Sequence, residues 1–313
     1  MEFASSLRKG QTPVCCNLCQ TETKIDWKCL PCNLLMCTKC IPRVSHISTG
    51  CDDALWISDG YVIQKVKPGK ENLEVICSYN TKIYGMTITP SNDLLLASAA
   101  WILKQISGNT GELTDTLYSV HPLGITAVHV TKNFHILVGA KTPGPALPAT
   151  GRRVVIRINK EGKHEKTYEH DRNKQPIFSY VQHITSTTNA TIFVVDMLSE
   201  DHRGRLVVLG QGGDVLNTYT GHPSINSDDK PFRPLYALTT PSDNIVVTDL
   251  RTNTLHILNS VGHLIKYYDT SNIGIRHPYS LSFTTSGQLY IGCTRALSCK
   301  DNGKLYKVDI SQI

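Results

Sequence analysis

One short apolar segment recurs along most of the chain, and each copy is flanked by polar turns. The segments are rich in β-branched residues and too short for helices, which is typical of buried strands. Six copies occur, at residues 54–59, 94–97, 135–138, 191–196, 245–249 and 289–292. A segment recurring in this way predicts a repeat architecture rather than a single irregular sheet.

Further strands surround each copy. An alternating segment follows it, at 61–66, 101–106, 153–158, 205–209, 254–258 and 304–309, and a more polar strand such as 264–268 comes next. Another strand precedes the copy, at 84–89, 125–131, 180–185, 235–239 and 279–284. Four antiparallel strands per repeat predict a mostly β protein with a six-bladed β-propeller over residues 53–313.

Two strands are missing from this count. We expect the first blade to lack its first strand and the last blade to lack its fourth, which would leave the ring incompletely closed. An open blade edge presents unpaired backbone groups. We therefore expect either that residues 41–51 cover part of this edge or that the chain self-associates through it.

Composition and charge exclude only a few classes of protein and cellular locations. Apolar residues make up 40% and charged residues 19% of the 313-residue chain, as in ordinary globular proteins. No apolar run approaches the roughly 20 residues of a membrane span, and the polar segment 1–13, expected to be flexible, does not read as a secretory signal. We expect no membrane contact and a cytoplasmic or nuclear location. The formal charge of +6 comes from scattered residues.

Cysteines crowd the N-terminal segment. Three Cys-x-x-Cys pairs occur within residues 16–40, and His46 follows. Each such pair can bring two thiolates to one Zn²⁺, and tetrahedral closure takes a second pair of ligands. Crowded cysteines in a chain without a secretory signal favour metal over disulfides. The sequence therefore predicts a zinc finger over residues 14–46 that holds one or two Zn²⁺ ions.

The spacing resembles the cross-brace B-box fingers of tripartite-motif proteins. The resemblance implies that the first and third pairs share one zinc and that the second pair and His46 share another. One histidine usual in the family is absent, and either Cys51 or a water would take its place. The implied ligands are Cys16, Cys19, Cys37 and Cys40 for the first zinc, and Cys29, Cys32, His46 and alternatively Cys51 for the second.

Turns such as 90–93 and 241–244 resemble those of NHL repeats. The whole chain thus resembles a tripartite-motif NHL protein, most of all its invertebrate members, but without a RING finger or coiled coil and with a linker of only residues 47–52. The resemblance implies a non-catalytic adaptor in ubiquitin-pathway or post-transcriptional regulation. Its finger and propeller would bind a partner protein, and the propeller face alternatively an RNA.

For RNA, basic and aromatic side chains on the propeller loops would supply phosphate attraction and base stacking. The candidates are Arg152, Arg153, Arg172, Lys174, Arg203, Arg205, Arg233, Arg251, Arg276 and Tyr279. Each of these side chains, taken singly, also fits a solvated loop residue without a binding role. The insertion 141–151 reads as an exposed loop between two strands of the third blade.

The alternative class is a metal-dependent propeller hydrolase or lyase. Its candidate ligands would be His129 and His183 on inner strands and Asp59, Asp196 and Asp249 at strand ends. The three acids occupy corresponding positions of their repeats, which favours a role in closing turns by side-chain hydrogen bonds. Common nucleophile and phosphate-binding motifs are absent. We therefore expect a protein without catalytic residues.

Overall fold

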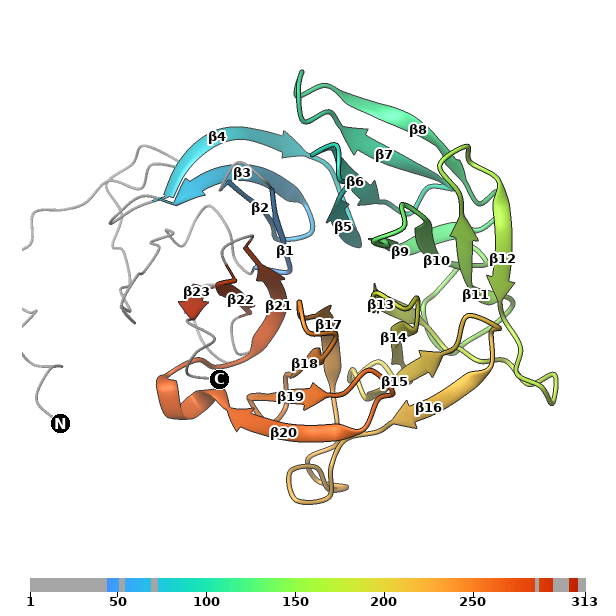
Figure 1. The fold of residues 1–313 in the computed structure, drawn as a ribbon, viewed down its shortest axis with the longest axis vertical. Coiled ribbons are helices and arrows are strands. Elements are labelled where there is room, and N and C mark those ends of the chain that lie inside the picture. The colour runs from blue at the N-terminus through green and yellow to red at the C-terminus, as the bar shows by residue number, and fades with distance from the viewer. Residues whose placement is uncertain (1–43, 51–53, 69–72, 285–286, 295–303, 309–313) are drawn as a thin grey trace, which may run out of the picture.

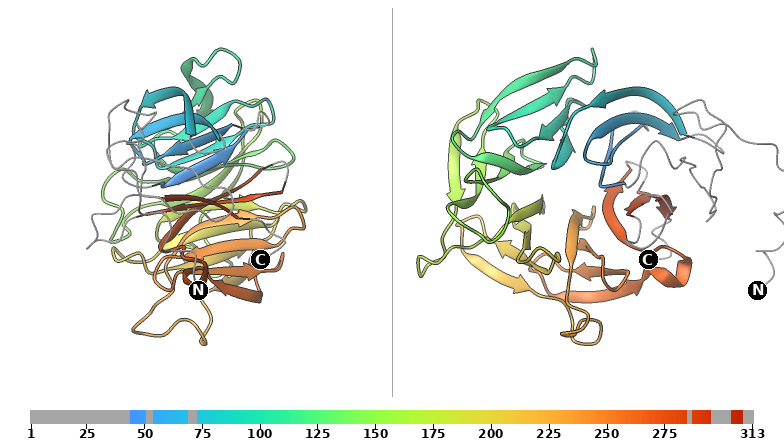
Figure 2. Two further views of the ribbon diagram at one scale, coloured as in Figure 1. Left: turned by 90° about the vertical axis from the view of Figure 1, so that its left-hand side faces the viewer. Right: turned by 180° about the vertical axis from the view of Figure 1, so that it is seen from behind.

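The computed structural model describes residues 44–50, 54–68, 73–284, 287–294 and 304–308. Six small antiparallel sheets stand around a central axis, and the chain passes through them in sequence order (Figure 1). From the side the molecule is a thick disc (Figure 2). The six-bladed β-propeller predicted from the repeats is confirmed.

Each blade is a meander whose first strand lies nearest the axis (Figure 1). The strands of the first three blades are β1 (His46–Thr49), β2 (Leu55–Ser58), β3 (Val62–Pro68), β4 (Leu73–Asn80); β5 (Gly85–Ile88), β6 (Leu94–Ala97), β7 (Ile102–Ile106), β8 (Leu113–Ser119); β9 (Gly124–Val130), β10 (Ile136–Lys141), β11 (Arg153–Ile158) and β12 (His164–Tyr168).

The remaining blades repeat the same order. They comprise β13 (Val181–Ser186), β14 (Ile192–Met197), β15 (Gly204–Leu209), β16 (Val215–Tyr219); β17 (Pro234–Thr239), β18 (Ile245–Asp249), β19 (Thr254–Leu258), β20 (Leu264–Asp269), the short 3-10 helix η1 (Thr270–Ile273); β21 (Pro278–Phe283), β22 (Leu289–Cys293) and β23 (Lys304–Val308). Every predicted apolar segment is the second strand of a blade.

Burial explains the hydrophobic pattern. The second strands, such as β6, β14 and β18, are buried along their whole length, because both faces pack against neighbouring blades. The fourth strands, such as β8 and β20, are largely exposed. Six hydrophobic clusters fill the interfaces between adjacent blades, one at each interface.

The expectation that the first blade lacks its first strand is wrong. Residues 46–49 form β1, which pairs with β2 and lies on the inner side of the first blade. The propeller therefore begins before residue 53, and the segment expected to be a linker at 47–52 contributes a strand. The prediction failed because His46 was assigned to the cysteine motif, and because a four-residue strand of mixed polarity carries little periodic signal.

The ring closes between the last blade and the first. Val44 donates its backbone N–H to the Cys293 carbonyl at 3.2 Å, and Ile47 packs with Tyr290 in one buried cluster. A Cβ at Gly292 would lie 2.8 Å from the Val44 carbonyl oxygen, so this close approach requires glycine. Residues 44–49 thus seal the inner side of the junction rather than the outer edge of the last blade. Among the described residues, that last blade has three strands.

Candidate partner-binding face

One face of the disc carries two sets of loops. Because each blade is an antiparallel meander, the turn from its second to its third strand and the connection to the next blade emerge on the same side. We call this side the loop face. It includes the insertion between β10 and β11, where residues 142–152 form an irregular and largely exposed segment, as predicted.

Aromatic side chains gather on the loop face near the axis. Tyr84 and Tyr180 immediately precede the inner strands β5 and β13, and Tyr279 lies at the start of β21. Burial, followed by the proximity of Tyr84 and Tyr279, raises the pKa of Tyr180 to about 12. Tyr84 lines one cavity with Tyr180 and another with Tyr279, so the three side chains lie close together although they come from three blades. We call this group the tyrosine mouth.

A lysine is held beside the mouth. The Nζ of Lys82 lies 5.8 Å from the ring centroid of Tyr61 and 5.5 Å from that of Tyr84. A cation over the faces of two rings is stabilised by their quadrupoles. The ring of Tyr61 is 56% exposed, so this arrangement faces solvent.

Two neighbouring cavities open at the tyrosine mouth, and Tyr84 lines both. The first, which we call the polar cavity, has a volume of about 210 Å³ and is lined by Ser45, His46, Gly60, Tyr61, Lys82, Ile83, Tyr84, Gln182 and Tyr279. The second, the apolar cavity, has about 320 Å³ and is lined by Tyr84, Ala99, Gly124, Ile125, Thr126, Lys141, Pro143, Gly144, Ala146 and Tyr180.

Each cavity contains a buried hydroxyl without a partner among the described residues. Ser45 in the polar cavity is 3% exposed, Thr126 in the apolar cavity is 4% exposed, and neither hydroxyl oxygen makes a hydrogen bond there. Buried polar groups of native proteins are nearly always paired, because an unmade hydrogen bond costs about 1–3 kcal/mol. Both oxygens are shielded from solvent, so these hydroxyls mark polar positions in the cavity walls rather than exposed donors.

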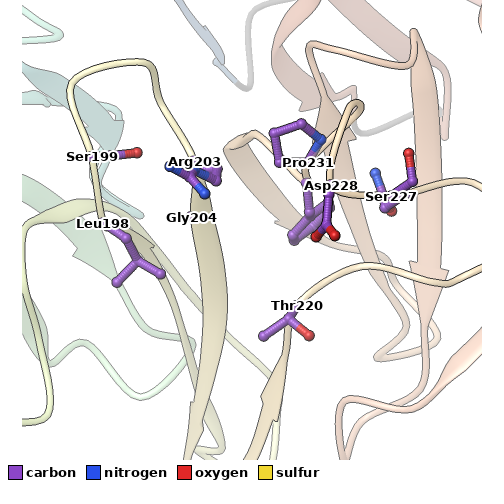
Figure 3. A pocket seen from close by; sticks show the side chains of 10 residues that line it. Leu198, Ser199, Arg203, Gly204, Thr220, Ser227, Asp228 and Pro231 are labelled. Carbon is purple, nitrogen blue, oxygen red and sulfur yellow. The ribbon is translucent and has the colours of Figure 1, made fainter.

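A wider groove of about 900 Å³ lies on the same face, between the β14–β15 turn and the long connection from β16 to β17 (Figure 3). Arg203 projects from the turn, and Asp228 and Pro231 lie across from it on the connection. The groove is open and carries charges of both signs. It forms a broad continuation of the loop face rather than an enclosed site.

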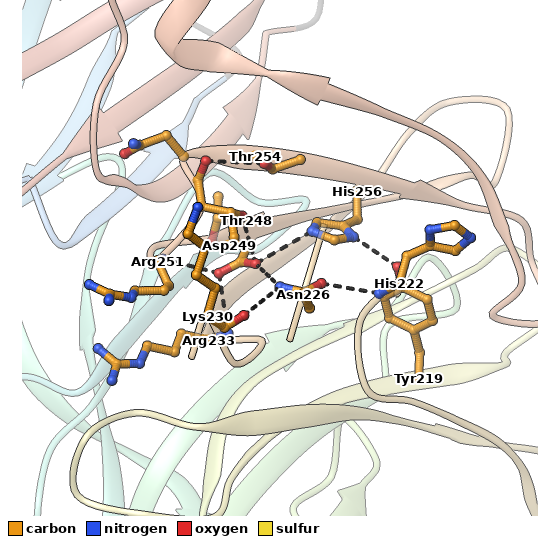
Figure 4. Close-up of polar contacts among 12 residues, drawn as sticks. Tyr219, His222, Asn226, Lys230, Arg233, Thr248, Asp249, Arg251, Thr254 and His256 are labelled. Atoms are coloured by element: carbon orange, nitrogen blue, oxygen red, sulfur yellow. Dashed lines mark hydrogen bonds and ion pairs between the residues drawn. The ribbon is translucent and has the colours of Figure 1, made fainter. Parts of the chain in front are cut away.

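Asp249 anchors the connection that borders this groove (Figure 4). It is fully buried at the end of β18 and accepts the Nδ2–H of Asn226 at 2.7 Å. Its other oxygen accepts the backbone N–H groups of Arg233 and Arg251 at 3.2 and 3.0 Å. Behind it, His256 Nε2 lies 3.6 Å from the carboxylate. The network fixes a long polar loop on a rigid blade.

The interpretation of the strand-end acids as turn-closing groups is confirmed for Asp59 and Asp249. Asp59 accepts the backbone N–H groups of Tyr61 and Val62, each at 2.8 Å, and Asp249 accepts that of Arg251 two residues on. Asp196 instead accepts the backbone N–H groups of Ser179 and Tyr180, on the connection that leads into its blade, at 2.8 Å. All three carboxylates thus accept hydrogen bonds from backbone donors.

The inner-strand histidines lie along the axis. His183 on β13 stacks on Tyr236 with 3.6 Å between centroids, and His129 Nε2 on β9 lies 3.0 Å from the Ser186 hydroxyl. Burial lowers the pKa of His129 to about 4, and burial with the nearby His129 and His46 lowers that of His183 well below 6.5. Within the part of the chain that the structure describes, no cluster of three or more potential ligands is arranged to hold a metal ion.

The structure places the predicted RNA-contacting residues around the loop face but does not gather them into one cationic patch. Ion pairs join Arg152 to Glu169, Arg172 to Asp214 and Arg205 to Asp196. A further carboxylate, that of Asp201, lies 2.8 Å from Arg233 and 3.9 Å from Arg203. Arg153 is 4% exposed and donates to the backbone carbonyls of Thr150 and Ser179. Lys174, Arg251 and Arg276 are exposed, and Tyr279 belongs to the tyrosine mouth.

The predicted zinc ligands Cys16, Cys19, Cys29, Cys32, Cys37, Cys40 and Cys51 lie outside the described residues. His46 is described, and its Nε2 lies 3.0 Å from the Tyr84 carbonyl, to which it donates because a carbonyl only accepts. The imidazole that the resemblance implies for the second zinc thus lines the polar cavity. The pairing of His46 with Cys29 and Cys32 stays a prediction. No helix in the described part is long and apolar enough to span a membrane.

Sequence reasoning missed the tyrosine mouth as a group. It singled out Tyr279 but not Tyr84, Tyr180, Lys82 or the two buried hydroxyls. A signal exists, because a tyrosine lies at or just before the inner strand of several blades, including Tyr236 on β17. Aligning the repeats on their inner strands would have brought these tyrosines into register.

Comparisons with known proteins support the fold. No family model matches the chain, and no curated protein sequence matches it. Solved structures do: a protein of unknown function from Bacteroides caccae has a TM-score of 0.57 and 12% identity, covering 84% of this chain and 89% of its own. Catalytically inactive virginiamycin B lyase from Staphylococcus aureus, determined with quinupristin, has a TM-score of 0.54 and 14% identity over 86% of this chain and 84% of its own. The WD40 propeller domain of Doa1 has the same TM-score and identity, covering 86% and 80%. At such identities the likeness establishes the propeller fold alone.

Proposed function

We propose that the chain is a non-catalytic recognition protein whose loop face binds a partner protein at the tyrosine mouth. The observation that carries this proposal is the convergence of three tyrosines, a ring-held lysine and two cavities at one position. One solved structure with the same fold is a lyase determined with quinupristin, which is an example of a propeller with a bound ligand.

The tyrosine mouth has the residue types and the rigidity that are typical of protein-binding sites. Tyrosine and arginine dominate binding hot spots, since a large, rigid ring buries much area at low entropic cost. The mouth residues extend from inner strands packed between blades, so their backbones are fixed before binding. Such preorganisation lowers the entropic cost of association. The wider groove beside the mouth supplies area for a polar rim.

We further propose that the N-terminal cysteines bind Zn²⁺ and form a second contact module, as their resemblance to B-box fingers implies. Closely spaced Cys-x-x-Cys pairs are the support for this part of the proposal. The finger would then extend the binding surface beyond the propeller, which would make the chain a zinc-binding adaptor. The propeller contact and the zinc contact are separable, because each has its own residues to change.

The test compares two purified variants with the wild-type chain. Tyr61→Ala with Tyr84→Ala removes one ring of the mouth and the exposed ring beside it, and Tyr267→Ala removes a ring with an exposure similar to that of Tyr61 from the outer strand β20. Partner proteins from the source cells are quantified by mass spectrometry, and the affinity of the strongest is then measured with purified components. We expect the mouth variant to bind that partner at least about ten-fold more weakly, since a hot-spot residue contributes about 2 kcal/mol or more.

The control variant, Tyr267→Ala, distinguishes binding at the mouth from a general effect of removing a tyrosine. Tyr267→Ala should retain wild-type affinity, because its ring lies on β20, the outermost strand of its blade, and not on the inner strands that carry the mouth. Equal binding by the mouth variant and the wild-type chain, with both folded by circular dichroism, would disprove the proposal.

A further inference from the structure

We propose that the tyrosine mouth takes an extended acidic peptide segment of the partner, with one carboxylate beside Lys82 in the polar cavity and an apolar side chain in the apolar cavity. The inference rests on the proposed function and specifies the chemistry that the loop face recognises. It follows from the charge and the lining of the two cavities.

Charge complementarity selects an anion for the polar cavity. Among the described residues that line either cavity, none carries a carboxylate. Lys82 makes no ion pair within the described part of the chain, and Tyr61 and Tyr84 hold its ammonium in place. An ammonium group has three donors and no acceptor, so an incoming carboxylate gives it charge-assisted hydrogen bonds. Gln182 adds a neutral amide on the same wall.

The neighbouring cavity selects an apolar group. Its walls include Ala99, Ile125, Pro143 and Ala146, together with the rings of Tyr84 and Tyr180. The one cation there, Lys141, is already committed, because its Nζ donates to backbone carbonyls of the insertion, among them that of Thr142 at 3.3 Å. Burial and the nearby Arg153 also lower the pKa of Lys141. This cavity therefore offers apolar surface rather than a free charge.

The arrangement of the two cavities fits an extended backbone. Alternate side chains of an extended peptide point to the same side, about 6.5 to 7 Å apart. The two cavities share Tyr84 as a common wall, so side chains at positions i and i+2 can enter one each.

Nucleic acid fits the same surface less well. Most arginines that would contact phosphates are paired with Glu169, Asp196, Asp201 and Asp214 or buried on backbone carbonyls. The exposed Arg251 and Arg276 line neither cavity. Binding a phosphate chain would mean breaking those pairs. An acidic side chain instead needs only Lys82, which already lies at the polar cavity.

The experiment selects a displayed library of random twelve-residue peptides on the folded wild-type chain. Enriched peptides are synthesised with and without Asp→Asn or Glu→Gln replacement, and their affinities are measured by fluorescence anisotropy. Protein variants are Lys82→Met and, as a matched control, Lys266→Met, which removes a lysine lying 4.8 Å from the Tyr268 ring centroid on an outer strand. A labelled random oligoribonucleotide is tested in parallel.

We expect enriched peptides to carry an acidic residue two positions from an apolar one. Their affinity should fall at least ten-fold on Lys82→Met or on neutralising the acid, should fall no further when both changes are combined, and should be unchanged by Lys266→Met. Enrichment of neutral or basic peptides, no enrichment, equal loss with Lys266→Met, or binding of the oligoribonucleotide alone would each overturn the inference. Peptides without acid preference whose binding still fails in the Tyr61→Ala, Tyr84→Ala variant would overturn the peptide chemistry while leaving recognition by the loop face intact.

Discussion

Replacing Asp249 with alanine should destabilise the propeller strongly, because one buried carboxylate serves four hydrogen-bond donors. The side chain is 0% exposed and accepts two backbone N–H groups, the Asn226 amide and the Thr252 hydroxyl. Burial alone would raise the pKa of Asp249, but the nearby His256 imidazole and the hydrogen bonds from Thr252 and Asn226 hold it below its usual value. The carboxylate is therefore charged in the folded protein and compensated on all sides.

The size of the stability loss follows from the donors that Asp249→Ala leaves without an acceptor. Each buried donor left unpaired costs about 1–3 kcal/mol, and the two backbone N–H groups cannot turn away, whereas Asn226 and Thr252 lie near solvent and can reorient. We expect Asp249→Ala to lower the free energy of unfolding by roughly 3–5 kcal/mol, and Thr252→Ala, which removes only one donor, by about 1 kcal/mol.

Urea denaturation followed by tryptophan fluorescence measures both variants, and hydrogen exchange reports on the connection from β16 to β17. Asp249→Asn retains one acceptor oxygen and should fall between them. A loss below about 1 kcal/mol for Asp249→Ala would refute the reasoning, since it would mean that water replaces the carboxylate without penalty.

Three further predictions follow from the packing, the buried histidines and the cysteine pairs. Burial lowers the pKa of His129 to about 4, whereas an unfolded histidine titrates near 6.5. The free energy of unfolding should therefore be highest above about pH 6.5 and fall as the pH drops toward 4, by at most about 1.4 kcal/mol per pH unit for this group. The urea midpoints at pH 7 and pH 5 should differ less in His129→Asn than in the wild-type chain. Gly139→Ala should lower the free energy of unfolding by about 1–3 kcal/mol in urea denaturation, since its Cβ would lie 3.0 Å from Val181 Cβ. Adding Val181→Ala should recover part of this loss, and no recovery would contradict the packing. Native mass spectrometry should find two zinc ions, with Cys29→Ser losing one and Cys16→Ser the other; one ion, lost only in Cys16→Ser, would leave the second site empty.

Most strands of the propeller could be predicted from the sequence, because a buried apolar segment recurs in every blade. Segments such as 245–249 and 254–258 coincide with β18 and β19, since a strand packed on both faces is mostly apolar. The strand β1 was missed because its four residues mix polar and apolar types and its identity depends on closing the ring with the last blade. A contact across the whole chain leaves no local signal.

The candidate site was predictable only in part, for a related reason. The turn-closing acids Asp59 and Asp249 were recognised, because each accepts hydrogen bonds from the backbone a few residues on. Tyr84 and Tyr180 come from different blades, and their proximity depends on the radius and order of the ring. Likewise, the sequence showed Arg172 and Arg205 as charges but not the carboxylates that pair with them.

Site-specific photo-crosslinking tests the central claim most directly. A benzoylphenylalanine replaces Tyr61 beside the mouth in one variant and Tyr267 on the outer strand β20 in another, positions with exposures of 56% and 46%. The account predicts that the purified partner crosslinks efficiently from position 61, that an excess of unlabelled wild-type chain suppresses this product, and that position 267 gives little or none. Crosslinks that form only from position 267 would contradict the account and place recognition on the outer rim of the disc.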